Sequence, residues 1–209
     1  MLDGAMRKVI DPPLNWIGRG LARAGVNANM VTLAGLALGL AAAGAIALES
    51  YLWGLGLIAG SRVLDGLDGA VARATQKTDF GGFLDIVADF AFYGAIPLGF
   101  VIADPAQNGV AGAFLLASFY FNGATFLGYS VLAERRGMES QSRGAKSLYF
   151  TRGLLEGTET IAFFGVICVF PAHFWWLAAL FGAASVFTGC SRVLLAWQVF
   201  GRQEQDRQT

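Results

Sequence analysis

The chain has 209 residues, of which 55% are hydrophobic and 14% are charged, and its formal net charge at pH 7 is +0. A soluble domain of this length carries more charged side chains on its surface, so the composition argues against a water-soluble protein and favours a membrane protein. The length suits a single domain, which we place at residues 1–209.

The first predicted element is a short helix at residues 13–25. Its apolar residues recur at three- and four-residue spacing beside Trp16, whereas Arg19 and Arg23 lie elsewhere on the helix. This pattern is typical of a helix that lies in the membrane interface, here on the cytoplasmic side. A plain polar arm is the alternative.

Six apolar stretches follow, each long enough to cross about 30 Å of hydrocarbon. They cover residues 30–50, 51–73, 80–103, 110–133, 149–170 and 174–200, and a polar tail follows at 201–209. We therefore predict an all-α integral membrane protein, in which the interfacial helix precedes a bundle of six transmembrane helices over residues 30–200.

The positions of lysine and arginine predict the orientation. With six spans, all of these side chains except Arg62 lie at one face of the membrane or in the helical half nearer to it. Because positively charged loops stay in the cytoplasm, we expect both termini and the second and fourth loops there, with the protein in a cytoplasmic (inner) membrane. Five or seven spans would scatter these charges over both faces.

Four aspartates fall inside the second and third predicted spans. Asp65 and Asp68 are three residues apart and Asp85 and Asp89 are four apart, so each pair lies on one helix face. Each carboxylate costs about 2.5–3.5 kcal/mol at the centre of a span unless something compensates its charge. Two antiparallel helices would bring all four to one level near the cytoplasmic face. Such oxygen ligands suit Mg²⁺ or Mn²⁺, and four carboxylates are enough for two ions about 3.5–4 Å apart, as in displacement reactions at phosphorus.

Three neighbouring residues add to this site. Gly69 and Gly81 leave room for a nucleotide or phosphate to approach the backbone. Arg73, one turn beyond Gly69, is placed to hold a phosphate. Arg62, one turn before Asp65, is expected to pair with a carboxylate rather than to bind substrate.

These residues together resemble the signature of the CDP-alcohol phosphotransferase (CDP-alcohol phosphatidyltransferase) family, which is D-x2-D-G-x2-A-R, seven or eight residues, and G-x3-D-x3-D. Every specified position is present, as Asp65, Asp68, Gly69, Ala72, Arg73, Gly81, Asp85 and Asp89. The six-span plan of that family covers residues 30–200. Its members usually open the first span with Pro-Asn and a threonine three residues later. Here Asn29 and Thr32 match, and Ala28 replaces the proline.

The resemblance implies a metal-dependent transferase of phospholipid biosynthesis. The donor would be CDP-diacylglycerol, and metal ions on Asp65, Asp68 and Asp85 would bridge its pyrophosphate. The acceptor hydroxyl would attack the β-phosphorus and CMP would leave, with Asp89 as a further ligand and as the base. The donor-binding residues implied are Asn29, Thr32, Asp65, Gly69, Ala72, Arg73 and Gly81. The partners implied are membrane lipid, a small alcohol and a second copy of the chain; we expect no nucleic acid partner.

The acceptor alcohol is not fixed by this signature. Lys146, Arg152 and Arg192 favour a phosphorylated polyol such as glycerol 3-phosphate or inositol phosphate, as basic residues do in members that use these. Glu156 and Glu159 fit instead the ammonium or hydroxyl groups of serine, inositol or an amino alcohol. We prefer the phosphorylated polyol and leave the other open. A CDP-choline or CDP-ethanolamine phosphotransferase that acts on diacylglycerol carries the same signature.

A cation transporter is the rival from another functional class, because carboxylates within the membrane also occur in transporters. Transporter sites lie more often near the bilayer midplane, between broken helices. Here the acids lie toward the cytoplasmic mouth beside Arg73, which repels cations, and this favours the enzyme.

Overall fold

The computed structural model describes residues 3–137 and 157–201, and all regular structure in these ranges is helical. The helices are α1 (Asp3–Arg23), α2 (Ala28–Ala47), α3 (Tyr51–Ala74), α4 (Asp79–Ala103), α5 (Pro105–Arg135), α7 (Gly157–Val169) and α8 (Phe174–Ala196). A 3₁₀ turn, η1 (Pro171–His173), precedes α8, and a π-helical turn, η2 (Trp197–Gly201), continues it. The predicted all-α class is confirmed.

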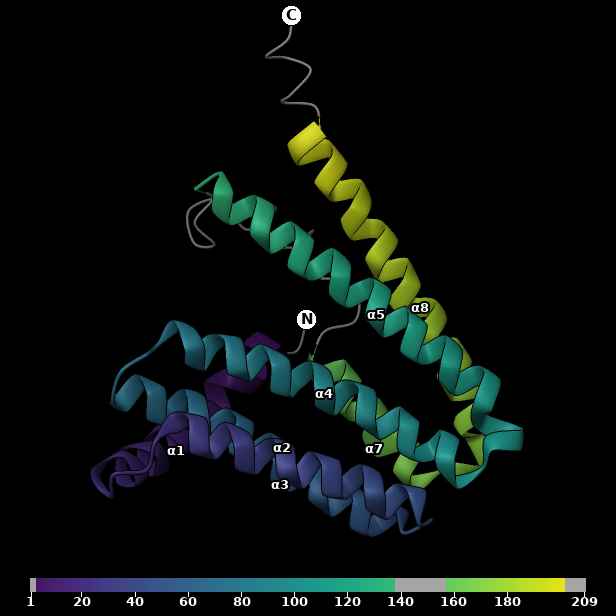
Figure 1. Cartoon of the computed structure of the whole chain (residues 1–209), viewed down its shortest axis with the longest axis horizontal. Coiled ribbons are helices and arrows are strands. Elements are labelled where there is room, and N and C mark those ends of the chain that lie inside the picture. Colours follow the sequence, from purple (N-terminus) through teal and green to yellow (C-terminus); the bar gives the residue numbers. More distant parts are fainter. Residues whose placement is uncertain (1–2, 138–156, 202–209) are drawn as a thin grey trace, which may run out of the picture.

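The helices form two groups (Figure 1). In the first group, α2 packs along both α3 and α4, and α1 packs on α3. In the second group, α5 and α8 run side by side and lean away from α4, which α5 contacts. α7 packs against α3. The helix with the most extensive contacts in the first group is thus α2, which itself carries none of the four aspartates.

The hydrophobic core lies where the two groups meet. Phe92 and Phe100 of α4 are fully buried, and Phe100 stacks on Phe174 of α8 with ring centroids 4.7 Å apart. Phe164 of α7 meets Phe92 edge-on, with centroids 5.9 Å apart. On α4 these aromatic residues all follow Asp89, so the polar half of the helix lies at the border of the core.

Four described segments are long and apolar enough to cross a bilayer, namely α2, α4, α5 and the segment Pro171–Gly201. α3 has 24 residues, or about 36 Å of helix, so its length also suffices, but its charged side chains lower its hydropathy. α7 has 13 described residues, and the predicted span at 149–170 begins outside the described ranges. The count of six spans therefore stays a prediction.

The N-terminal helix is longer than predicted. It begins at Asp3 rather than at residue 13, and it continues through Pro12 and Pro13. Near its C-terminal end it crosses α3 in close contact, because a Cβ atom added to Gly18 would lie 2.7 Å from the Cβ of Ala70. Its position in the membrane interface stays a prediction.

Helix α4 lies close to the backbone of α2 at Gly99, and this contact predicts the effect of a methyl group. A Cβ atom there would lie 2.7 Å from the backbone oxygen of Ala43, which cannot move aside easily. We expect Gly99→Ala to destabilise the protein by about 1–3 kcal/mol, as overpacked cores do. Thermal unfolding in detergent measures this. Gly94→Ala on the same helix is the matched control, because its Cβ would meet nothing within 4 Å, and it should unfold at or slightly above the wild-type temperature. Equal unfolding temperatures for the two variants would contradict the close contact.

Candidate metal and nucleotide site

The four aspartates come from the facing ends of α3 and α4. α3 ends at Ala74, and Thr78 caps the start of α4 by accepting a hydrogen bond from the backbone N–H of Gly81 at 3.0 Å. This side-chain cap starts the new helix within a few residues of the old one. The aspartate pairs therefore lie at similar distances from the turn between the helices.

Helix α2 packs against both carboxylate-bearing helices. The sequence predicted α3 and α4 as direct neighbours, but each packs mainly on α2. The α2 face between them is lined by small buried residues, Thr32, Gly35 and Gly39. Small residues allow this close packing, and it is the aspartate and arginine side chains that bridge α3 and α4.

Three of the four aspartates converge. One carboxylate oxygen each from Asp65, Asp68 and Asp85 lies within 4.8 Å of the others. Asp68 is only 6% exposed, and its Oδ2 atom has no hydrogen-bond partner among the described residues. A buried carboxylate oxygen without a partner is costly, and a cation would remove that cost. The residues present therefore fit a divalent metal ion with oxygen ligands.

The fourth aspartate turns toward an arginine. Oδ1 of Asp89 accepts a hydrogen bond from Nη1 of Arg62 at 2.8 Å, and the same nitrogen lies 3.3 Å from Asp65. Asp89 does not belong to the group formed by the other three. The predicted pairing of Arg62 with a carboxylate is confirmed.

The predicted donor-binding residues come from three helices, α2, α3 and α4. Thr32 of α2 is buried and lies beside Asp68. Asn29, at the start of α2, points its Oδ1 atom to within 3.2 Å of where a Cβ of Gly81 would be. On α3, Ala72 is half-buried. Glycine at position 81 thus leaves space between the first turns of α2 and α4.

Arg73 is held by a residue that the sequence did not single out. Its Nε and Nη2 atoms donate to Oδ1 of Asn15 on α1, at 3.2 and 2.9 Å. Its Nη1 atom lies 3.2 Å from where a Cβ of Gly69 would be. The absence of a side chain at Gly69 therefore lets the guanidinium group lie along α3. No sequence signal marks Asn15, because it reaches Arg73 only through the crossing of α1 over α3.

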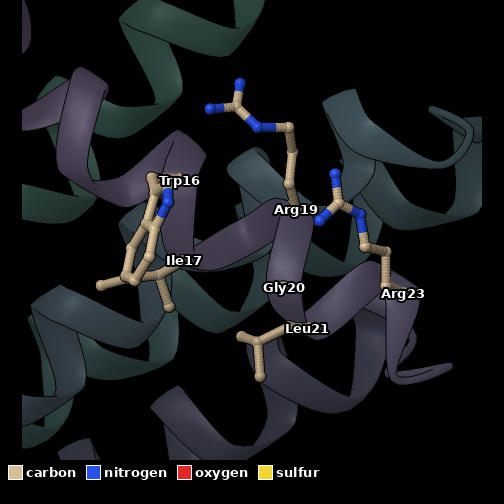
Figure 2. Close-up of a pocket in the computed structure, with 6 residues that line it drawn as sticks. All are labelled: Trp16, Ile17, Arg19, Gly20, Leu21 and Arg23. Atoms are coloured by element: carbon tan, nitrogen blue, oxygen red, sulfur yellow. The ribbon is translucent and has the colours of Figure 1, made fainter.

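The exposed surface of α1 carries a separate open hollow, which is lined by Trp16, Ile17, Arg19, Gly20, Leu21 and Arg23 (Figure 2). In this view Arg19 and Arg23 extend from the helix, and none of the aspartates of the site lines the hollow. The hollow is a feature of the N-terminal helix rather than part of the metal site.

The predicted acceptor residues are only partly described. Lys146, Arg152 and Glu156 lie outside the described residues. Glu159 is half-buried in the first turn of α7. Arg192 of α8 is 7% exposed, and its Nη1 atom donates to the side chain and backbone oxygens of Asn122 at 2.8 and 3.1 Å and to the hydroxyl of Thr125 at 3.0 Å. The sequence missed these two α5 residues because nothing along the chain links them to α8.

A family model for CDP-alcohol phosphatidyltransferase matches residues 26–189. The chain belongs to the CDP-alcohol phosphatidyltransferase family. The resemblance predicted from the aspartate signature is confirmed, and the family consists of membrane transferases of phospholipid biosynthesis that bind metal.

Two curated relatives match different shares of this chain. The "Inner membrane protein YnjF" of Escherichia coli (strain K12) is 44% identical over 193 residues, which are 92% of this chain and 94% of that protein. An archaetidylinositol phosphate synthase of Pyrococcus horikoshii is 33% identical over 115 residues, 54% of this chain and 61% of that protein. The apolar helices and the first of these relatives indicate an integral inner membrane protein.

Solved structures share the fold of this chain. Mycobacterium tuberculosis phosphatidylinositol phosphate synthase with CDP-DAG bound has a TM-score of 0.71 and 23% identity, over 88% of this chain and 93% of that one. The same protein in complex with manganese and citrate has a TM-score of 0.69 and 24% identity, over 88% of each chain.

Proposed function

We propose that the protein transfers a phosphatidyl group from CDP-diacylglycerol to the hydroxyl of a small polar alcohol and releases CMP. The observation that carries this proposal is the convergence of Asp65, Asp68 and Asp85 around a buried oxygen of Asp68 that has no hydrogen-bond partner within residues 3–137 and 157–201. Such a group of carboxylates would hold Mg²⁺ or Mn²⁺. The family membership and a structural relative with CDP-DAG bound support the donor.

Each residue of the site has a defined task in this proposal. A bound divalent cation supplies neutralisation of the charge on the donor pyrophosphate. Asn29, Thr32, Gly69, Ala72, Arg73 and Gly81 shape the pocket of the cytidine nucleotide, with Arg73 held by Asn15. The acceptor oxygen forms a bond to the β-phosphorus, the bond from that phosphorus to the CMP oxygen breaks, and the hydroxyl proton moves to Asp89. Positioning and charge neutralisation are what this reaction class requires.

The preferred acceptor is a phosphorylated polyol. The buried guanidinium of Arg192, together with Lys146 and Arg152, would bind its phosphate. Two curated relatives are named archaetidylinositol phosphate synthases, which agrees with this choice. Glu156 and Glu159 would contact its hydroxyl groups, and in the alternative they would bind an unphosphorylated alcohol.

The proposal includes the orientation of the protein in the membrane and its oligomeric state. Both termini and the site would face the cytoplasm, where CDP-linked donors and small polar alcohols are present, and six spans would place them there. The protein would act as a homodimer, an expectation from the family alone.

An assay with purified protein tests the function. We expect CMP and a new lipid when CDP-diacylglycerol and Mg²⁺ are combined with a phosphorylated polyol, and no CMP when a chelator removes the cation. The panel contains glycerol 3-phosphate, inositol phosphate, inositol, serine and ethanolamine, and a second reaction offers CDP-choline with diacylglycerol. Turnover with serine or inositol alone would replace the preferred acceptor by the alternative. No CMP with any acceptor or donor would reject the enzyme.

A further inference from the structure

The exposed face of α1 carries two arginines that bind nothing within the protein. Arg19 and Arg23 are four residues apart, so they lie on one face of the helix, and both side chains are exposed. Neither guanidinium group has an ion-pair or hydrogen-bond partner within residues 3–137 and 157–201. No acidic residue lines the hollow that they border. This surface is therefore positively charged and accessible to an anion.

A glycine opens the hollow down to the backbone of α1. Gly20 follows Trp16 by four residues and precedes Arg23 by three, so the three residues share one face. A Cβ atom added to Gly20 would meet nothing within 4 Å. The hollow has a volume of about 490 Å³, which is within the roughly 300–1,000 Å³ of sites for small molecules. The space suits a head group rather than a water molecule.

The hollow has a charged side and an apolar side (Figure 2). The guanidinium groups of Arg19 and Arg23 extend from α1 on one side, whereas Ile17 and Leu21 lie on the other. The side chain of Trp16 stands next to Ile17, and the residue is 73% exposed. A free anion would contact the arginines alone. A molecule that joins a phosphate to hydrocarbon chains matches both sides, and this favours a phospholipid.

The packing of α1 places the hollow at the level of lipid head groups. Gly18 is buried against Ala70, in the last turns of α3, so the face with the hollow is turned away from α3. Arg23 ends α1, and Ala28 starts α2, which is long and apolar enough to cross a bilayer. Tryptophan is enriched at this level, and each arginine near an anionic membrane surface strengthens binding roughly fivefold.

We propose that the hollow on α1 is a binding site for an anionic phospholipid. Arg19 and Arg23 bind the phosphate of its head group, and Trp16 and Ile17 pack against the first part of its acyl chains. None of the aspartates of the metal site lines the hollow, so a lipid bound there is neither donor nor product at that site. The inference goes beyond the proposed transfer reaction and does not depend on it.

Quenching of Trp16 by brominated lipids tests this inference. Full-length protein is placed in nanodiscs of phosphatidylcholine that contain a minor share of brominated phosphatidylglycerol or, in a parallel sample, of brominated phosphatidylcholine. The difference between the wild type and Trp16→Phe gives the signal of Trp16. We expect stronger quenching by the phosphatidylglycerol. This preference should fall about fivefold in Arg19→Gln and disappear when Arg23→Gln is added.

Two further variants separate the site from the charge of the surface. Gly20→Leu fills the hollow and keeps both arginines, and the open space above Gly20 should let it fold. It should also lose the preference for phosphatidylglycerol. The double variant Lys77→Gln/Arg135→Gln is the matched control, because it removes the same charge at exposed positions outside α1. It should keep the preference.

Equal quenching by the two lipids in the wild type would overturn the inference. Weak quenching by both would also overturn it, because a protein surface such as a second copy of the chain would then cover the hollow. A preference that inorganic phosphate abolishes would replace the lipid by a free phosphate ion. An equal loss in the matched control would show attraction by general surface charge and no site. Each of these results would leave the proposed function standing, because none of them measures CMP release.

Discussion

Asp68→Asn is expected to lower the rate of phosphatidyl transfer on the order of 10³-fold without unfolding the protein. Loss of a ligand weakens the binding of a cation that stabilises the transition state by several kcal/mol. A loss of about 4 kcal/mol of this stabilisation corresponds to a 10³-fold lower rate. The same variant removes a buried charge, one oxygen of which has no hydrogen-bond partner in the described part of the chain. In the presence of a chelator, its unfolding temperature should therefore be no lower than that of the wild type. CMP release and thermal unfolding in detergent measure the two effects.

The effect of added Mg²⁺ on the unfolding temperature distinguishes a metal ligand from a residue with only a structural role. It should raise the unfolding temperature of the wild type, because a ligand that binds only the folded state stabilises it, and it should leave that of Asp68→Asn unchanged. Asp79→Asn, at the exposed first turn of α4, is the matched control and should keep both activity and the Mg²⁺ effect. Wild-type activity in Asp68→Asn would remove Asp68 from the site.

Asp89→Asn is expected to reduce kcat by about 10²–10⁴-fold, the usual contribution of a general base. Asparagine keeps an oxygen that accepts the hydrogen bond from Arg62, so the local structure should survive. Asp89 lies outside the group of three converging carboxylates, so the affinity for CDP-diacylglycerol should be retained. Single-turnover kinetics and donor binding, measured on the same preparation, separate these effects.

Asp85→Asn is the comparison for this second variant, because it lies one turn earlier on the same helix and belongs to the converging group. It should lose donor affinity and Mg²⁺ binding as well as turnover. Near-normal turnover in Asp89→Asn would refute its role as the base. A parallel loss of donor affinity in both variants would show that Asp89 acts with the metal ligands.

Much of the site could be predicted because its residues lie close together along the chain. Spacing of three and four residues places Asp65 with Asp68 and Asp85 with Asp89 on single helix faces, whatever the rest of the fold does. The bounds of α3 and α4 agree with the predicted spans within one residue, because apolar length and a capping threonine define them. The family signature is likewise a set of positions along the chain.

The partners of the charged residues were not predictable in the same way. Spacing shows that Arg62 is near Asp65, but the choice of Asp89 as its closer partner depends on the rotation of α4 about α2. The same holds for Asn15 with Arg73, and for Asn122 with Arg192, because in each case two helices far apart in sequence must cross at one level.

The sequence by itself determined an apolar helical chain with four acids in two pairs, and hence the family. Only the tertiary structure decided that three of these acids converge while the fourth binds an arginine. The reason is physical: helical periodicity fixes which side chains share a face, whereas the close packing of small residues on α2 against α3 and α4 fixes how those faces are turned toward each other.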